Sequence, residues 1–296
     1  MCIIEKYIDK LILNLPKNDN KRPINIDLVM DGGAFNGSYL IGCLHFLKKM
    51  ENIGYIKIKR ISGCSISSFI GLHYLINRLD NLTTHYTSWH SHFIKKKNFE
   101  FILHINNIIP IDYDLSLINH KLYITYNNVK YMKKIVIYKY KNTNDTIETI
   151  IRSSFIPFLI NGEMLYKKKY IDGCTPYLFS PKKNREILYL NLINFDKIYQ
   201  SLNVSNEKTN YGRIMYGILD IYQFYGKEKY ITEICSYYKD WTIIHKIKHY
   251  LLLLVEKIII ITLYLFIKIE LNKYKYGNIN FTDNGYSRIV YYLFRK

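Results

Sequence analysis

A serine lies among small residues in the segment GCSIS, residues 63–67. The alternating apolar stretch Tyr55–Ile61 before it predicts a strand, and the apolar residues of Ser68–Arg78 after it predict a helix. A sharp turn from strand to helix exposes the hydroxyl of its central residue and aims helix N–H groups toward it. Ser65 is therefore a candidate nucleophile. The alternative interpretation is an ordinary turn that carries a serine, because small residues are common in turns.

A glycine-rich loop, DGGAFNG at residues 31–37, precedes this serine. The short apolar segment Ile24–Met30 predicts a buried strand before the loop, and the apolar residues of Ser38–Met50 predict a helix after it. Backbone N–H groups at a helix start can hold the negative charge that develops in acyl transfer. The alternative is a glycine turn that only connects strand to helix. Two successive strand–loop–helix units predict a parallel sheet covered by helices.

Two further motifs complete a pattern: RSSFIP at residues 152–157, and Asp172-Gly173 after an apolar pair. An isolated Asp-Gly pair usually marks a turn. In their order along the chain, however, the four motifs resemble those of the patatin-like phospholipases, over about residues 24–190. The resemblance implies an α/β fold with a mostly parallel sheet sandwiched by helices. It also implies a lipid acyl hydrolase that cleaves carboxylic esters of phospholipids or other lipids.

By position, the resemblance implies that Ser65 is the nucleophile and that Asp172 is the base of a Ser–Asp dyad. N–H groups of Gly32, Gly33 and Ala34 would hold the oxyanion before water cleaves the acyl-serine. A carboxylate with an ordinary pKa near ~3.9 is a weak base, so we expect surroundings apolar enough to raise that pKa.

Four residues depart from the family pattern. Ala34 stands where a third glycine is usual, Asn36 replaces Arg or Lys, Ser67 replaces Gly, and Cys174 replaces a second Gly or Ala. If Ala34 needs a positive φ, its Cβ costs on the order of 1 kcal/mol and misaims a donor. These departures motivate an alternative function, a catalytically silent patatin-like protein that binds lipid or membrane.

The charge and the cysteines exclude other classes of protein. The formal net charge is +18, but only eight of the 42 cationic residues are the arginine favoured for reading bases and phosphates, so we expect no nucleic acid partner. The five cysteines form no CxxC pair, and Cys64 is expected to pack inward. His245 and His249 lack a third ligand, so we expect no metal and no cofactor. A reducing compartment favours an intracellular, cytoplasmic protein.

The chain divides into three predicted regions. Residues 1–23 form an amphipathic helix, residues 24–195 a catalytic domain, and residues 196–296 a helical extension. Further strands are expected at Tyr131–Tyr140 and Ile187–Ile193. The polar and aromatic region 85–120 shows no clear periodicity, so it is expected to be an irregular lid or insertion.

Within the extension, Trp241–Leu271 is long and apolar, with Glu256 and Lys257 near its middle. Each charge costs roughly 2.5 to 3.5 kcal/mol at the centre of a bilayer, which disfavours a spanning helix. We therefore expect peripheral attachment to an anionic membrane surface, with lysines toward the head groups. The alternative is an ordinary core helix packed on the sheet.

Overall fold

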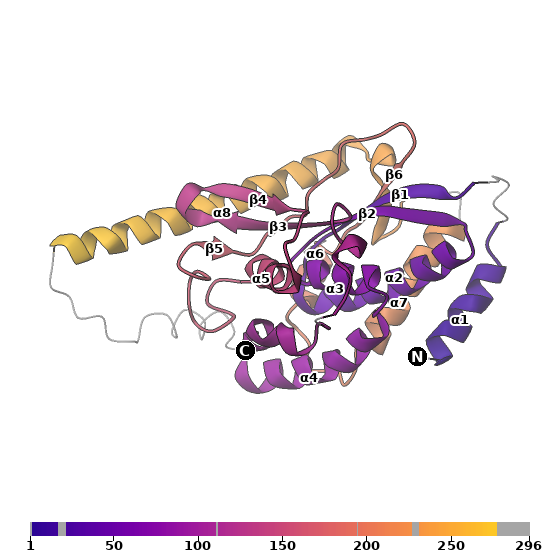
Figure 1. Cartoon of the computed structure of the whole chain (residues 1–296), viewed down its shortest axis with the longest axis horizontal. Helices are drawn as coiled ribbons and strands as arrows, with labels where there is room; N and C mark the ends of the chain where they lie inside the picture. Colours follow the sequence, from indigo (N-terminus) through magenta and orange to yellow (C-terminus); the bar gives the residue numbers. More distant parts are fainter. Residues whose placement is uncertain (1, 17–21, 111, 194, 227–230, 277–296) are drawn as a thin grey trace.

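The computed structural model describes residues 2–16, 22–110, 112–193, 195–226 and 231–276 (Figure 1). Its main elements, in chain order, are α1 (Cys2–Leu13), β1 (Ile24–Met30), α2 (Gly37–Asn52), β2 (Ile56–Cys64), α3 (Ile66–Leu75), α4 (Asp80–Lys96), β3 (Leu122–Asn128), β4 (Lys133–Ile137), α5 (Thr143–Ser153), β5 (Tyr170–Ile171), β6 (Glu186–Leu190), α6 (Phe195–Gln200), α7 (Tyr211–Gly226), β7 (Cys235–Tyr237) and α8 (Ile243–Tyr276). Short 3₁₀ turns include η1 (Ala34–Asn36), η2 (Glu100–Asn107) and η4 (Val129–Tyr131).

The strands form one mixed sheet in the order β4-β3-β2-β1-β6-β7, with β5 also paired to β3. β1 pairs in parallel with both β2 and β6, and β2 pairs in parallel with β3. β4, β5 and β7 join their neighbours antiparallel. The predicted α/β class, with a mostly parallel sheet flanked by helices and a C-terminal helix, is confirmed at this level.

Alternate residues of the central strands face two different layers. Ile26, Leu28 and Met30 of β1 belong to the main core with α2 and α7, whereas Val29 belongs to a second cluster with Trp241. In Figure 1, α8 runs along the top of the sheet while α2, α4 and α7 lie below it. Both faces of the sheet are therefore covered, as the buried character of parallel strands requires.

The main core includes helices that precede and helices that follow the glycine loop in the sequence. α1 packs on α2 through Ile4 and Ile8, which are buried while charged residues of α1 face outward, so the N-terminal segment does contain an amphipathic helix, which ends at Leu13 within the expected range 1–23. α2 and α7 approach closely, because a Cβ at Gly42 would lie 2.0 Å from the carbonyl oxygen of Ile214. Only glycine permits this contact.

Some predicted boundaries are wrong. Much of the region 85–120 is regular, because α4 covers Asp80–Lys96 and η2 follows. The buried residues of α4, Leu82, Tyr86, Trp89 and Phe93, recur at helical spacing, but histidines and hydroxyl residues between them obscure the pattern. The expected strand at 131–140 shortens to β4, since η4 occupies its start. β3 and α5 were not predicted.

Candidate active site

Ser65 lies at the sharp junction between β2 and α3. Its backbone has φ 54° and ψ −133°, a conformation that residues with a Cβ rarely adopt. Its N–H donates to both the hydroxyl and the carbonyl oxygen of Ser153, at 2.9 and 3.0 Å. The Ser68 hydroxyl donates to the Ser65 carbonyl at 2.6 Å. These contacts hold the strained turn, and the predicted serine elbow is present.

Small residues on either side of Ser65 make this turn possible. A Cβ at Gly63 would lie 2.9 Å from backbone atoms of Ser67, so no larger residue fits there. The Ser67 hydroxyl accepts the N–H of Cys64 at 2.9 Å and lies 2.9 Å from the carbonyl oxygen of Met30, which joins the end of β1 to the elbow. Cys64 packs inward as predicted, and burial raises the pKa of its thiol well above the ordinary value.

The glycine loop lies directly against this serine. A Cβ at Gly32 would lie 3.1 Å from the Cβ of Ser65. Gly33 has φ 151° and Ala34 has φ 46°, so Ala34 does occupy the positive-φ position that the sequence suggested. Within the described residues, the N–H groups of Gly32, Gly33 and Ala34 make no hydrogen bond, whereas those of Asp31 and Phe35 do. Three successive N–H groups of the loop that contacts Ser65 are thus free to donate, within the described residues.

Asp31 anchors the loop at its start. Its carboxylate accepts the Tyr189 hydroxyl at 2.5 Å and the N–H of Leu192 at 3.2 Å. Burial raises the pKa of Asp31 to about 6, against the lowering effect of these donors. The carboxyl therefore links the end of β1 to β6 and to the segment after it, and makes no hydrogen bond to Ser65 in the described structure.

Asp172 lies beyond β5, next to the serine elbow. A Cβ at Gly173 would lie 2.2 Å from the carbonyl oxygen of Thr125, so this turn needs its glycine. The Asp172 N–H donates to the carbonyl of Phe155 at 2.9 Å, and one carboxyl oxygen, Oδ1, accepts the N–H of Cys174 at 2.7 Å. The chain thus holds the carboxyl in one orientation.

The second oxygen of Asp172, Oδ2, is buried and makes no hydrogen bond of ordinary geometry with the described residues. Burial raises the pKa of Asp172 to about 6, and a side-chain hydrogen bond with Ser65 lowers it in part. We interpret the Ser65 contact as a loose hydrogen bond, of the kind that tightens when substrate binds. The two residues of the expected dyad are side by side, and the raised pKa matches the expectation for a base.

Behind Asp172 lies a buried polar cluster that sequence reasoning missed. Glu256 of α8 accepts hydrogen bonds from Asn127 at 2.7 Å, Thr175 at 2.5 Å and Lys134 at 3.0 Å. Asn127 also donates to the carbonyl oxygen of Asp172 at 3.0 Å. The charge of Glu256 raises the pKa of Asp172 and that of Lys134 lowers it. No local motif announces this cluster, because its members come from β3, β4, the segment after β5, and α8.

A narrow apolar pocket opens at Ser65, lined by Ala34, Phe35, Ser65, Ile66, Trp89, Phe99, Phe101, Ile102, Ser154 and Ile156. Its volume of about 40 Å³ leaves room for a few water molecules and is too small for an acyl chain. The buried hydroxyl of Ser154 makes no hydrogen bond with the described residues. Substrate entry therefore requires α4 or η2 to move.

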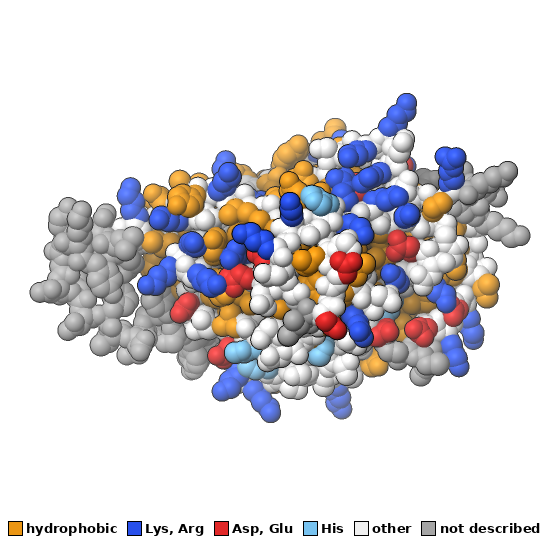
Figure 2. All heavy atoms as spheres, in the orientation of Figure 1, with side chains coloured by type: hydrophobic (Ala, Val, Ile, Leu, Met, Phe, Trp, Pro, Cys, Tyr) orange, Lys and Arg blue, Asp and Glu red, His pale blue; other side chains and the backbone are white. Residues whose placement is uncertain are grey.

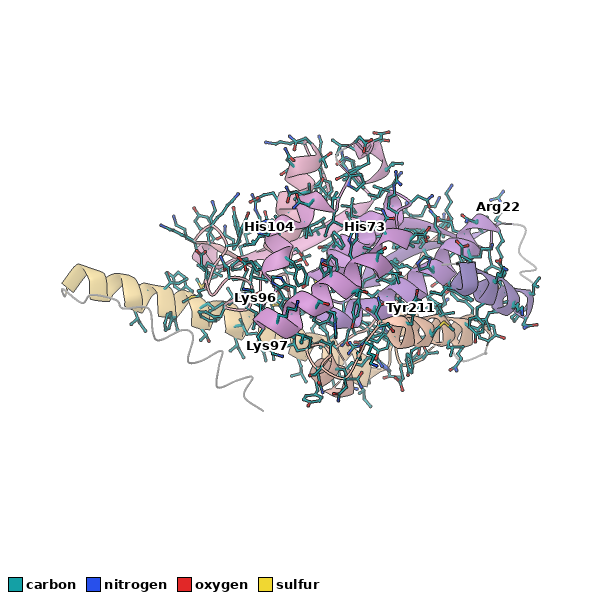
Figure 3. The ribbon with its side chains drawn as sticks, turned by 90° about the horizontal axis from the view of Figure 1, so that it is seen from below. Arg22, His73, Lys96, Lys97, His104 and Tyr211 are labelled. Carbon is teal, nitrogen blue, oxygen red and sulfur yellow. The ribbon has the colours of Figure 1, made fainter. Side chains whose placement is uncertain are left out.

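Other candidate groups lie elsewhere. Within the described residues, no cluster of His, Cys, Asp and Glu is arranged to hold a metal ion. His249 is buried on α8 beside Tyr189, and His245 contacts Thr242. A larger hollow of about 470 Å³, lined by residues that include Arg22 and Arg185, lies near the starts of β1 and β6. Arg22 is labelled in Figure 3. The hollow is at the opposite end of the parallel strands from Ser65.

Comparison with known protein families and with curated proteins finds no match to this chain.

Proposed function

We propose that this protein is a serine acyl hydrolase of the patatin-like kind, which cleaves the carboxylic esters of lipids through an acyl-serine intermediate. One observation carries the proposal. The strained Ser65 contacts the glycine loop, whose N–H groups at residues 32–34 make no hydrogen bond within the described part of the chain, and it lies beside the buried carboxyl of Asp172. Nucleophile, base and oxyanion donors are the three groups that acyl transfer requires.

The chemistry follows from these positions. The Ser65 oxygen attacks the ester carbonyl carbon while its proton passes to Asp172, and the N–H groups of Gly32, Gly33 and Ala34 stabilise the oxyanion. The tetrahedral intermediate collapses, the ester C–O bond breaks, and Asp172 protonates the departing alcohol. Water then attacks the acyl-serine, with Asp172 accepting its proton. The bond between the acyl carbon and the Ser65 oxygen breaks, Asp172 returns the proton to that oxygen, and the fatty acid leaves.

The surroundings of Ser65 favour lipid esters over polar substrates. Phe35, Trp89, Phe99 and Phe101 line the pocket, and its only polar side chains among the lining residues are those of Ser65 and Ser154. An acyl chain would gain the hydrophobic transfer energy of this lining once the pocket opens, roughly 0.8 kcal/mol for each buried CH₂. A charged or sugar substrate would bury its polar groups against these aromatic side chains without hydrogen-bond partners.

Asn36 supplies further support at a position where the family pattern has a cation. Its amide oxygen accepts a hydrogen bond from the guanidinium of Arg213 at 2.7 Å. Arg213 is itself buried on α7 and pairs with Glu207. A cation from α7 thus reaches the loop although residue 36 is neutral.

The catalytically silent, lipid-binding alternative rests on Ala34. Its φ of 46° places a Cβ where glycine would be unstrained, in the loop that must aim the donors. In this alternative the protein binds lipid in the pocket but does not hydrolyse it.

Hydrolysis of a panel of p-nitrophenyl esters, phospholipids and triacylglycerols by the purified protein tests the proposal. We expect turnover of acyl esters that Ser65→Ala and Asp172→Asn each reduce by about a thousandfold or more. Ser116→Ala, at an exposed serine, is the matched control and should keep full turnover. Equal activity in the wild type and Ser65→Ala would overturn the dyad.

A further inference from the structure

The outer face of α8 is an exposed apolar surface. The stretch Ile243–Ile269 has a mean hydropathy of 2.3, and only 11% of its most apolar part is buried. Six aliphatic residues, spaced three, four or seven positions apart, are each 50% to 55% exposed: Ile247, Leu251, Leu254, Ile258, Leu265 and Ile269. At about 100° per residue these six fall within an arc of about 60°. An apolar face of this length marks an interaction site.

The inner face of the same helix is fixed to the domain. Glu256 is bound to Lys134, Thr175 and Asn127, as described above, and Ile260 packs with Val129 and Ile171. His249 is also buried. Because these residues lie opposite the six aliphatic side chains on the helix, the domain itself determines which side of α8 faces outward.

The charges on α8 are arranged around the outer face. Lys246, Lys257 and Lys268 are exposed and eleven positions apart, so they lie within about 40° of one another along one flank. Lys248 is exposed on the other flank. The single acidic residue of Ile243–Ile269 is Glu256, which faces inward. Figure 2 shows hydrophobic atoms beside Lys and Arg side chains along the upper edge, where Figure 1 has α8.

We propose that this outer face docks in the plane of an anionic lipid bilayer, with the aliphatic side chains below the head groups and the flanking lysines among the phosphates. Long lysine side chains reach head groups from such flanks while their stems stay in apolar surroundings. The surface is separate from the chemistry at Ser65, so it extends the proposed function without depending on it.

Two other occupants fit the face less well. A helix that spans the bilayer would have to pull Glu256 away from Lys134 and carry it into hydrocarbon. A protein partner usually meets a surface enriched in aromatic residues and arginine and depleted in lysine, whereas this face is aliphatic and flanked by lysine.

Vesicle sedimentation of the full chain tests the apolar part. We expect binding to phosphatidylcholine vesicles that contain about a third phosphatidylserine, both for the wild type and for Ser65→Ala. A triple variant of Leu251→Gln, Leu254→Gln and Ile258→Gln should lose most of this binding. The matched control changes three exposed apolar residues elsewhere, Leu13→Gln, Ile53→Gln and Leu117→Gln. Retained binding by the α8 variant would overturn the proposal.

The lysines are tested with a second pair of variants. Lys246→Gln, Lys257→Gln and Lys268→Gln together should weaken binding to the anionic vesicles roughly 100-fold, at about fivefold for each lysine near the surface. The control replaces Lys95, Lys96 and Lys97 by glutamine, at the end of α4. Lys96 and Lys97 lie on the underside of the molecule seen in Figure 3, away from α8. Equal losses in both variants would contradict a specific docking face.

Two outcomes identify the other occupants. Resistance of bound protein to alkaline carbonate extraction would show a spanning helix, because an in-plane helix is released. A concentration-dependent dimer in sedimentation equilibrium, dissociated by the α8 apolar variant and accompanied by no vesicle binding, would assign the face to a second copy. Each of these results overturns the proposal, and neither depends on ester hydrolysis.

Discussion

Three of the ten described non-glycine residues with positive φ lie at the candidate site. Ala34, Ser65 and Cys174 all carry a Cβ and all have φ between 46° and 54°. Each such residue costs of order 1 to 3 kcal/mol, and the surrounding hydrogen bonds must offset that cost. The three residues supply or adjoin the oxyanion donors, the nucleophile and the base, so the strain coincides with the proposed chemistry.

At Ala34, removal of the Cβ should relieve strain. Ala34→Gly is expected to keep the free energy of unfolding within about 1 kcal/mol of wild type, because relief of strain opposes the added freedom of the unfolded chain. Ester hydrolysis should stay equal or increase, as the N–H groups aim more freely. Urea unfolding and kcat/KM measure both. A large loss of kcat/KM would show that these donors do not serve the reaction.

The raised pKa of Asp172 sets the pH dependence. A base must be ionised to accept the Ser65 proton, so kcat/KM should rise with pH, with a midpoint near pH 6. Asp31 has a similar pKa, and its carboxyl makes no hydrogen bond to Ser65 in the described structure, which makes Asp31→Asn the control. That variant should keep the midpoint. If the midpoint of the pH profile disappeared in Asp31→Asn, the base would be Asp31 and not Asp172.

The same burial means that ionised Asp172 lowers the free energy of unfolding. Its pKa is above that of the unfolded chain, so ionisation destabilises the native state as pH rises through about 6. Asp172→Asn should therefore raise the free energy of unfolding by about 3 kcal/mol at pH 8. The gain should nearly vanish at pH 3.5, where the carboxyl is protonated in the native state and mostly protonated in the unfolded chain. Denaturant unfolding at the two pH values checks this, and equal effects at both would contradict it.

Among the elements, α8 connects the outer surface to the site. Its inner face covers the sheet and brings Glu256 to the cluster behind Asp172, as described above. Glu256 is 4% exposed and Lys134 27%, so water screens this ion pair less than a surface pair. The seating of α8 therefore influences the base.

Glu256→Gln tests this connection. The charge of Glu256 raises the pKa of Asp172, and the charge of Lys134 lowers it. Without the charge of Glu256 that pKa should fall, so the midpoint of the pH profile should lie below that of the wild type. The variant should also lose on the order of 1 to 3 kcal/mol of unfolding free energy, because Lys134 is left partly buried without its partner. Glu186→Gln removes a more exposed pair with Lys239 and should cost under about 1 kcal/mol. An unchanged pH profile would show that Glu256 of α8 does not influence the pKa of Asp172.

The sequence predicted the parts of this structure that local patterns encode. β1, the glycine loop and the turn at Ser65 are contiguous motifs, and their geometry followed from residue size and order. α4 was missed because polar residues separate its buried side chains. Glu256 was known only as a charge within an apolar segment, since its partners on β3 and β4 become neighbours through the fold. Long-range contacts of this kind carry no local signal.

At the scale of the whole molecule, the protein is a sheet covered on both faces, with the candidate site at one end of its parallel strands. The pocket at Ser65 is nearly closed by α4 and η2, and the outer face of α8 is exposed. Opening of the pocket and attachment of α8 concern different layers of the fold, so each can be measured without the other.

Covalent labelling by a fluorophosphonate probe tests the central claim most directly, since only an activated serine reacts with it. The wild-type protein is predicted to form one adduct, located at Ser65 by mass spectrometry of its peptides. Labelling should be faster at pH 8 than at pH 5 and should be absent in Ser65→Ala. A folded wild-type protein that takes up no probe, or that is modified at another serine, would contradict the account.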